Sequence, residues 1–252
     1  MDREEKLGFA RLLTARLLAA HGEDRLVALG VQGSLARGDD TEGSDLNLAV
    51  ITADPEVHVP DRTLSYQGTV VDLAAITADA YLEQATQIGP LWPVAADQYL
   101  HTLALHDPTG YFQRLRQAHQ EAVVQAPSEA FLEAAGYDLV RLLALDAKAR
   151  AAELYGDVAG ALLAVREALV FAALVVGLVT RTPYRNDVHA VRTVAGGAGA
   201  PPSLLEPYRR ALSPLTDPAT AVIALGRVRD ALVELARREG IPFEADDPGA
   251  FL

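Results

Sequence analysis

The chain has 252 residues, of which 50% are hydrophobic and 22% charged, a composition typical of a globular protein with room for two modest domains. It contains no cysteine, which excludes disulfides, thiolate metal sites and cysteine nucleophiles. Its net charge of −12 argues against broad binding to the phosphate backbone of nucleic acids and would favour a cationic small molecule instead.

The sequence predicts no targeting segment and no membrane span. The N-terminus, MDREEKLGFARLL, is charged from its second residue and lacks the apolar core of a secretory signal. The apolar run at 168–179 is shorter than the roughly 20 residues that a bilayer requires, so we expect a buried helix there. The absence of cysteine fits a reducing compartment, and together these features predict a cytoplasmic protein.

Residues 1–126 show alternating helix and strand patterns. Apolar residues at helical spacing, with Thr77 as one N-cap, predict helices at 3–20, 78–87, 94–104 and 109–125. Alternating apolar residues and a Gln67-Gly68 turn predict strands at 25–32, 45–51, 63–66 and 69–75. This part of the chain is therefore expected to form an α/β domain.

From Pro127 onward the pattern is almost wholly helical. Helices separated by Gly- and Pro-containing breaks are predicted at 129–154, 158–179, 187–195, 203–212 and 218–239. The composition shift near residue 126 divides the chain into domains 1–126 and 127–252, and the second is expected to be an all-α bundle.

The most informative segment runs from residue 33 to residue 47. Gly33-Ser34 forms a turn after the first predicted strand, and Ser44-Asp45 opens the second. Such a turn can present backbone N–H groups and the Ser34 hydroxyl to phosphate oxygens, and Arg37 can add a forked cation. Asp45 and Asn47 are two residues apart on a strand, so their side chains share a face.

Asp72 adds a carboxylate on what should be a neighbouring strand. Transfer of a nucleotidyl group to a hydroxyl needs a divalent metal held by carboxylates, donors for phosphate oxygens and a base. Taken singly, each residue could instead belong to an ordinary polar turn or to an exposed strand end, because turns are rich in such residues. The complete set between two strands favours a nucleotide site.

The segment Gly33-Ser34 to Ser44-Asp45-Leu46-Asn47 resembles the signature of polymerase-β-like nucleotidyltransferases. The chain as a whole is similar to the kanamycin nucleotidyltransferase family, which adenylylates the 4′-hydroxyl of aminoglycosides. The similarity extends, in order and at near-matching spacing, over residues 69–85, 92–99, 106–111 and 173–184. This resemblance implies a polymerase-β-like α/β (α+β) domain with a mixed sheet, followed by a helical bundle like that of the family.

The resemblance also implies roles for individual residues. Asp45 matches a metal ligand and catalytic position, Asp72 matches an acidic residue lining the site, and Asn47 completes the expected magnesium set. The positions implied for binding the nucleotide are Gly33, Ser34, Arg37, Ser44 and Arg150.

The family's general base is a glutamate on the first long helix of the C-terminal domain, with a lysine one turn later. The best match here is Asp146 with Arg150, and Glu153 is the next candidate. The alternative interpretation of Asp146 and Arg150 is an ion pair on the surface of a helix. Relatives take base and metal ligands from different subunits, so the resemblance implies a homodimer with interface clefts, using Mg²⁺ and ATP.

One position departs from the family pattern, because relatives carry Asp or Glu where this chain has Asn47. An amide oxygen can coordinate magnesium but brings no negative charge, which matters in phosphoryl transfer. Two hypotheses follow: an enzyme that transfers AMP to a hydroxyl of a small cationic molecule, or a weakly or non-catalytic relative that binds a nucleotide or small ligand. Aminoglycosides are the acceptors that the resemblance implies, with lincosamides or another metabolite as alternatives.

Overall fold

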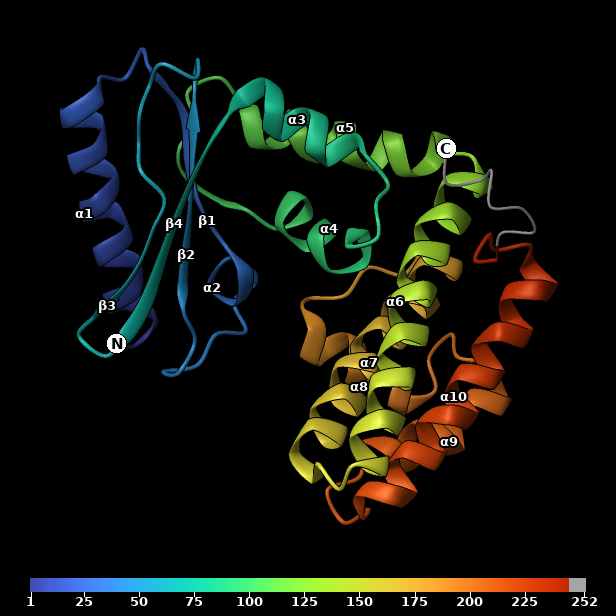
Figure 1. Cartoon of the computed structure of the whole chain (residues 1–252). Coiled ribbons are helices and arrows are strands. Elements are labelled where there is room, and N and C mark those ends of the chain that lie inside the picture. Colours follow the sequence, from blue (N-terminus) through green and yellow to red (C-terminus); the bar gives the residue numbers. More distant parts are fainter. Residues whose placement is uncertain (245–252) are drawn as a thin grey trace. The chain divides into compact units, whose positions relative to one another are not determined.

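The computed structural model describes residues 1–244, which form two compact units (Figure 1). The first unit comprises Met1–Gln87 and Ala96–Gln125, and the second comprises Ile88–Ala95 and the described residues 126–244. The division at 125/126 lies next to the predicted domain boundary, and in addition the short segment Ile88–Ala95 belongs to the second unit.

The first unit contains a five-stranded sheet with helices packed on it. Its strands are β1 (Leu26–Gln32), β2 (Leu46–Thr52), β3 (Arg62–Tyr66), β4 (Thr69–Thr77) and β5 (Leu103–His106), in the order β3-β4-β2-β1-β5. Its helices are α1 (Arg3–His21), α2 (Gly33–Arg37), α3 (Ala78–Thr86) and α5 (Tyr111–Gln125); α4 (Trp92–Leu100) has residues in both units. Strands β2 and β4 pair in parallel and all other pairs are antiparallel, which confirms the mixed sheet.

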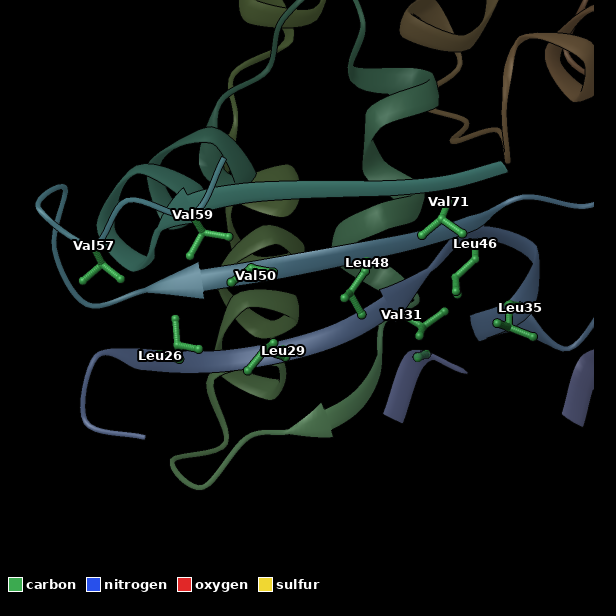
Figure 2. Packing of buried hydrophobic residues seen from close by; sticks show 11 residues of the cluster. Leu26, Leu29, Val31, Leu35, Leu46, Leu48, Val50, Val57, Val59 and Val71 are labelled. Atoms are coloured by element: carbon green, nitrogen blue, oxygen red, sulfur yellow. The ribbon is translucent and has the colours of Figure 1, made fainter. Parts of the chain in front are cut away.

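Strand alternation gives the sheet two different faces. One face carries the apolar side chains shown in Figure 2, which pack with Ala10 and other α1 residues into a core cluster. Helices α3 and α5 lie on the opposite face (Figure 1). There a Cβ on Gly30 would lie 2.6 Å from Thr102 and 2.8 Å from the Phe112 ring, so a glycine is needed for α5 to approach β1.

Two features of the first unit bear on the sequence predictions. Thr77 is the N-cap of α3, because its side chain accepts a hydrogen bond from the N–H of Ala80. The helix predicted at 94–104 was wrong at its end: α4 stops at Leu100, and Leu103–His106 form β5. This four-residue strand is fixed by long-range pairing with β1, which its short pattern does not reveal.

The second unit is the predicted helical bundle. Its helices are α6 (Ser128–Leu154), α7 (Val158–Val179), α8 (Asp187–Gly196), α9 (Pro202–Leu212) and α10 (Pro218–Glu239). Helix α7 has a mean hydropathy of 2.3 over its most apolar window, so by length and composition alone it could cross a membrane. However, 61% of that window is buried inside the fold, as expected for the core helix of a bundle.

Asp138 on α6 makes the stability of the bundle depend on pH. Its side chain is fully buried, and neither carboxylate oxygen has a hydrogen-bond partner among residues 1–244. Burial raises the pKa of Asp138 to about 7, although the charge of Arg141 opposes the shift. The folded state therefore holds this proton more tightly than the unfolded chain, and stability should fall as the pH rises from about 4 to about 7.

Replacing Asp138 with asparagine is expected to remove this dependence. A pKa rise from 3.8 to about 7 corresponds to at most about 4 kcal/mol of lost stability above pH 7. Urea unfolding at pH 5 and pH 8 should show a large decrease for the wild type and a much smaller one for D138N. The exposed Glu133 on the same helix provides a control, since E133Q should keep the wild-type dependence. Equal pH dependence in D138N and wild type would contradict the prediction.

Candidate functional site

The predicted phosphate turn lies where β1 ends. The chain leaves Gln32, adopts a positive φ of 70° at Gly33, and forms the short helix α2, which ends at Gly38 with a φ of 85°. Buried Leu35 anchors this helix in the core cluster, while Ser34 lies in its first turn. The first N–H groups of such a turn have no partner within the helix and can bind phosphate oxygens.

Register pairing brings the turn together with two of the proposed metal ligands. Gln32 lies opposite Asn47, and Asn47 lies opposite Asp72 on the parallel strand β4. A Cβ on Gly33 would lie 3.1 Å from Nδ2 of Asn47, so this side chain contacts the turn directly. Neighbouring Leu46 and Val71 belong to the core cluster, so Asn47 and Asp72 both point to the opposite face of the sheet.

Asp72 also has a partner on the edge strand. The Thr63 hydroxyl donates to its Oδ1 at 2.6 Å, across the β3–β4 pair in which the two residues are in register. Its other oxygen is not held by this bond. The sequence offered no signal for Thr63, because threonine is common in strands and its role depends on strand register.

Asp45 and Ser44 immediately precede β2. Asp45 is exposed and lies two residues before Asn47, so an extended chain presents both side chains to the same face. The Ser44 hydroxyl accepts the N–H of Thr41 at 2.9 Å, and the Ser44 N–H donates to the Thr41 carbonyl at 3.0 Å. Ser44 thus closes the turn that leads into the strand, in addition to its predicted contact with the nucleotide.

Arg37 is held by acidic neighbours. Its guanidinium forms an ion pair with Asp97 of α4, and its Nε lies 3.2 Å from Oδ1 of Asp39. Asp97 is buried and also lies 3.0 Å from Nδ1 of His101. These contacts fix the guanidinium at the phosphate turn. Asp97 was missed by sequence reasoning, because it is 60 residues away in the chain and has no motif around it.

Asp146 and Arg150 lie in the second unit, where the structure shows the predicted contact between them. The Asp146 side chain is 0% exposed, and its Oδ2 accepts from Arg150 at 2.9 Å and from Arg229 of α10 at 2.8 Å. The ion pair of the alternative interpretation is thus present, but the Asp146 carboxylate is buried between α6 and α10 and not at the surface. Arg229 was not foreseen, since nothing in α10 marks it. Glu153 is exposed.

The donor chemistry of the first unit suits magnesium. Within residues 1–244, no three His, Cys, Asp or Glu side chains gather closely enough to hold a metal ion. The candidate set is instead two carboxylates, Asp45 and Asp72, with the amide oxygen of Asn47. Hard oxygen donors of this kind fit Mg²⁺, which ordinarily completes its coordination with water and substrate phosphates.

Replacing Gly33 with alanine is expected to disrupt the turn. A positive φ disfavours any L side chain by roughly 1–2 kcal/mol, and the new methyl group would press against Asn47. We expect about that loss of stability in urea unfolding and at least a tenfold loss of ATP affinity by calorimetry. Gly89, in the segment before α4, has no positive φ, and an added Cβ there would meet nothing within 4 Å, so G89A is a matched control that should change neither value. Normal ATP affinity in G33A would contradict this role.

Comparisons with known proteins bear on the family resemblance and on the fold. No family model matches the chain. The aminoglycoside nucleotidyltransferases (4') of Staphylococcus aureus and of a Bacillus species are each 26% identical to it over 125 residues, covering 50% of this chain and 49% of theirs. The match thus spans about half the length of these relatives. It confirms the resemblance found in the sequence.

A solved structure supports the fold over most of the chain. The nucleotidyltransferase-like protein from Exiguobacterium sibiricum 255-15 aligns over 90% of this chain and 80% of its own, with a TM-score of 0.52 and 15% sequence identity. The chain therefore has a nucleotidyltransferase-like fold, in which a mixed-sheet domain is followed by a helical region.

Proposed function

We propose that the protein is a magnesium-dependent nucleotidyltransferase that transfers AMP from ATP to a hydroxyl group of a small cationic acceptor. The observation that carries this proposal is the meeting of Gly33, Asn47 and Asp72 at one end of the sheet, next to Asp45. Phosphate-binding N–H groups and oxygen ligands for a cation are thereby combined at one place, as binding of a nucleoside triphosphate requires.

In the proposed reaction, the acceptor hydroxyl oxygen forms a bond to the α-phosphorus while the bond to pyrophosphate breaks. The turn at Gly33-Ser34 and the guanidinium of Arg37 bind phosphate oxygens, and Asp97 keeps that guanidinium in place. Asp45, Asp72 and Asn47 hold the ion. When bound, Mg²⁺ supplies charge neutralisation for the phosphates.

The acceptor class is proposed from the relatives and from charge. The names of the curated relatives specify aminoglycosides, which are polycations, and this chain carries a net charge of −12. We also propose a cytoplasmic homodimer, as the family resemblance implies. Light scattering coupled to gel filtration tests the dimer, and elution at the mass of a single 26.8 kDa chain would contradict it.

Two carboxylates are candidates for the base that receives the hydroxyl proton. Asp146 matches the family position, but its carboxylate is enclosed and bound by two arginines, whereas Glu153 is exposed. Loss of a general base typically lowers turnover about 10²- to 10⁴-fold. We expect such a loss, with unchanged ATP affinity, in only one of the variants D146N and E153Q. Equal turnover in both variants and the wild type would exclude both residues as bases.

One assay tests the proposed function. Purified protein is incubated with Mg²⁺, ATP and a panel of aminoglycosides, lincosamides and uncharged polyols, and released pyrophosphate is measured while the acceptor is analysed by mass spectrometry. The proposal expects adenylylated product with aminoglycosides only, and none when EDTA is added. Product with lincosamides only would show that the acceptors are lincosamides and not aminoglycosides. Failure to bind MgATP would contradict the proposal itself.

Asn47 favours a second candidate function, a relative that binds the nucleotide but does little chemistry. Its neutral amide leaves two carboxylates, Asp45 and Asp72, at a site where the family resemblance implies a third. In the same assay this candidate predicts measurable MgATP affinity with no product from any acceptor.

A further inference from the structure

A buried lysine of the first helix contacts the loop that leads to the site. The Lys6 side chain on α1 is 0% exposed, and its ammonium group donates to the carbonyl oxygen of Thr41 at 2.5 Å. Burying a charged amine without partners is costly, so a buried lysine is held where an acceptor is available. Here that acceptor is a backbone carbonyl of the loop between α2 and β2.

A second cation of the same helix contacts the same loop. Arg3 forms an ion pair with Asp40, whose side chain is only 3% exposed. Arg3 and Lys6 are three residues apart and therefore lie on one side of α1. The capping box between Asp2 and Glu5 fixes the first turn of the helix, from which both cations extend. Helix α1 thus holds two consecutive loop residues, Asp40 and Thr41.

The held carbonyl belongs to the turn that precedes Asp45. The Thr41 oxygen that accepts from Lys6 also accepts the N–H of Ser44, and the Ser44 hydroxyl accepts the N–H of Thr41. Asp45 follows directly in the chain. Unlike Asp72, which is bound to Thr63, Asp45 is exposed at the loop end and depends on the backbone conformation of this turn for its position.

We propose that Lys6, assisted by Arg3, is a positioning residue for the metal site: it fixes the turn 41–44 and thereby the carboxylate of Asp45. The inference rests on the proposed function, since it concerns the ion that accompanies the triphosphate. It assigns a functional reason to a lysine whose side chain is fully buried. It also separates two parts of the site, because Arg3 and Lys6 bind Asp40 and Thr41, whereas the turn at Gly33-Ser34 is anchored through Leu35 in the core cluster.

The substitution K6M tests this role. Methionine retains an apolar stem of similar length, and the Thr41 carbonyl keeps its bond from Ser44, so the variant removes the charge without leaving that acceptor unpaired. We expect calorimetry to show about tenfold weaker MgATP binding, while binding of ATP in EDTA changes less than twofold. A merely structural role would not produce this difference. Amide exchange at Ser44 should also become faster in ligand-free K6M.

The control is R11M, because Arg11 is an exposed residue of the same helix, and it should leave both affinities unchanged. Folded K6M with wild-type MgATP affinity would overturn the inference while leaving the proposed function intact. If K6M does not fold, R3M decides, since the Arg3 side chain is 41% exposed. It should weaken MgATP binding at least threefold, and an unchanged affinity would overturn the inference. A wild-type protein that does not bind MgATP would overturn both proposals.

Discussion

Replacing Asp45 with asparagine is expected to reduce MgATP-dependent pyrophosphate release by at least about 100-fold. The proposed site has two carboxylates for the ion, and the variant retains only Asp72, beside the neutral Asn47. Loss of a single group that stabilises developing charge commonly costs about 10²- to 10³-fold in turnover. The measurement is the initial rate of pyrophosphate release at saturating ATP, over a series of magnesium concentrations.

Because Asp45 is exposed, D45N should unfold at the wild-type urea concentration, so that a loss of rate reports the site and not the fold. The matched control is E56Q, which removes an exposed carboxylate from the loop after the other end of β2. It should keep the wild-type rate. A rate in D45N within a few-fold of wild type would show that Asp45 does not hold the ion.

Replacing Asn47 with aspartate is expected to have the opposite effect. The variant places a third carboxylate directly beside Asp72, and the added negative charge should tighten magnesium binding. We expect turnover to rise about tenfold, the change that roughly 1.4 kcal/mol of additional transition-state stabilisation produces. Without the ion, neighbouring like charges should lower stability by about 1 kcal/mol, so Mg²⁺ should raise the melting temperature more in N47D than in wild type.

The control for N47D adds the same charge elsewhere. Asn186 is the N-cap of α8 in the second unit, and aspartate can cap a helix equally well, so N186D should change neither turnover nor the response to magnesium. If N47D binds MgATP more tightly and still forms no product, the non-catalytic alternative is favoured. If magnesium binding does not change, position 47 is not a ligand.

Much of this fold was predictable because its signals are local. Helices α7 and α8 begin at Asp157 and Asn186, whose side chains cap the first turn, and α8 and α10 end at the glycines Gly197 and Gly240. The strands β1 and β2 were marked by alternation and by the turn between them. Strand β5 was not predictable, since four residues carry too little pattern and their pairing with β1 is a long-range contact.

In the candidate site, too, some residues were predictable from the sequence and others were not. The positions 33, 34, 45, 47 and 72 could be proposed from the sequence because a polar turn and two strands carry them at a meaningful spacing, whereas their partners could not. Asp97, Thr63 and Arg229 come from distant elements and contact the site residues only after folding. Lys6 carries no signal in the sequence that sets it apart from the other charged residues of its helix, and only its burial in the folded chain distinguishes it.

The hydrogen bond between Thr63 and Asp72 makes the orientation of the Asp72 carboxylate depend on the edge strand β3. Strand β3 is the outermost strand on its side, and all five of its residues are exposed, so its pairing with β4 is the part of the sheet most open to fraying. When β3 detaches, the carboxylate of Asp72 loses the hydroxyl that orients it. If a bound substrate prefers the oriented carboxylate of Asp72, thermodynamic linkage requires that it also stabilises the pairing of β3 with β4. Binding at the site would then order the edge strand β3.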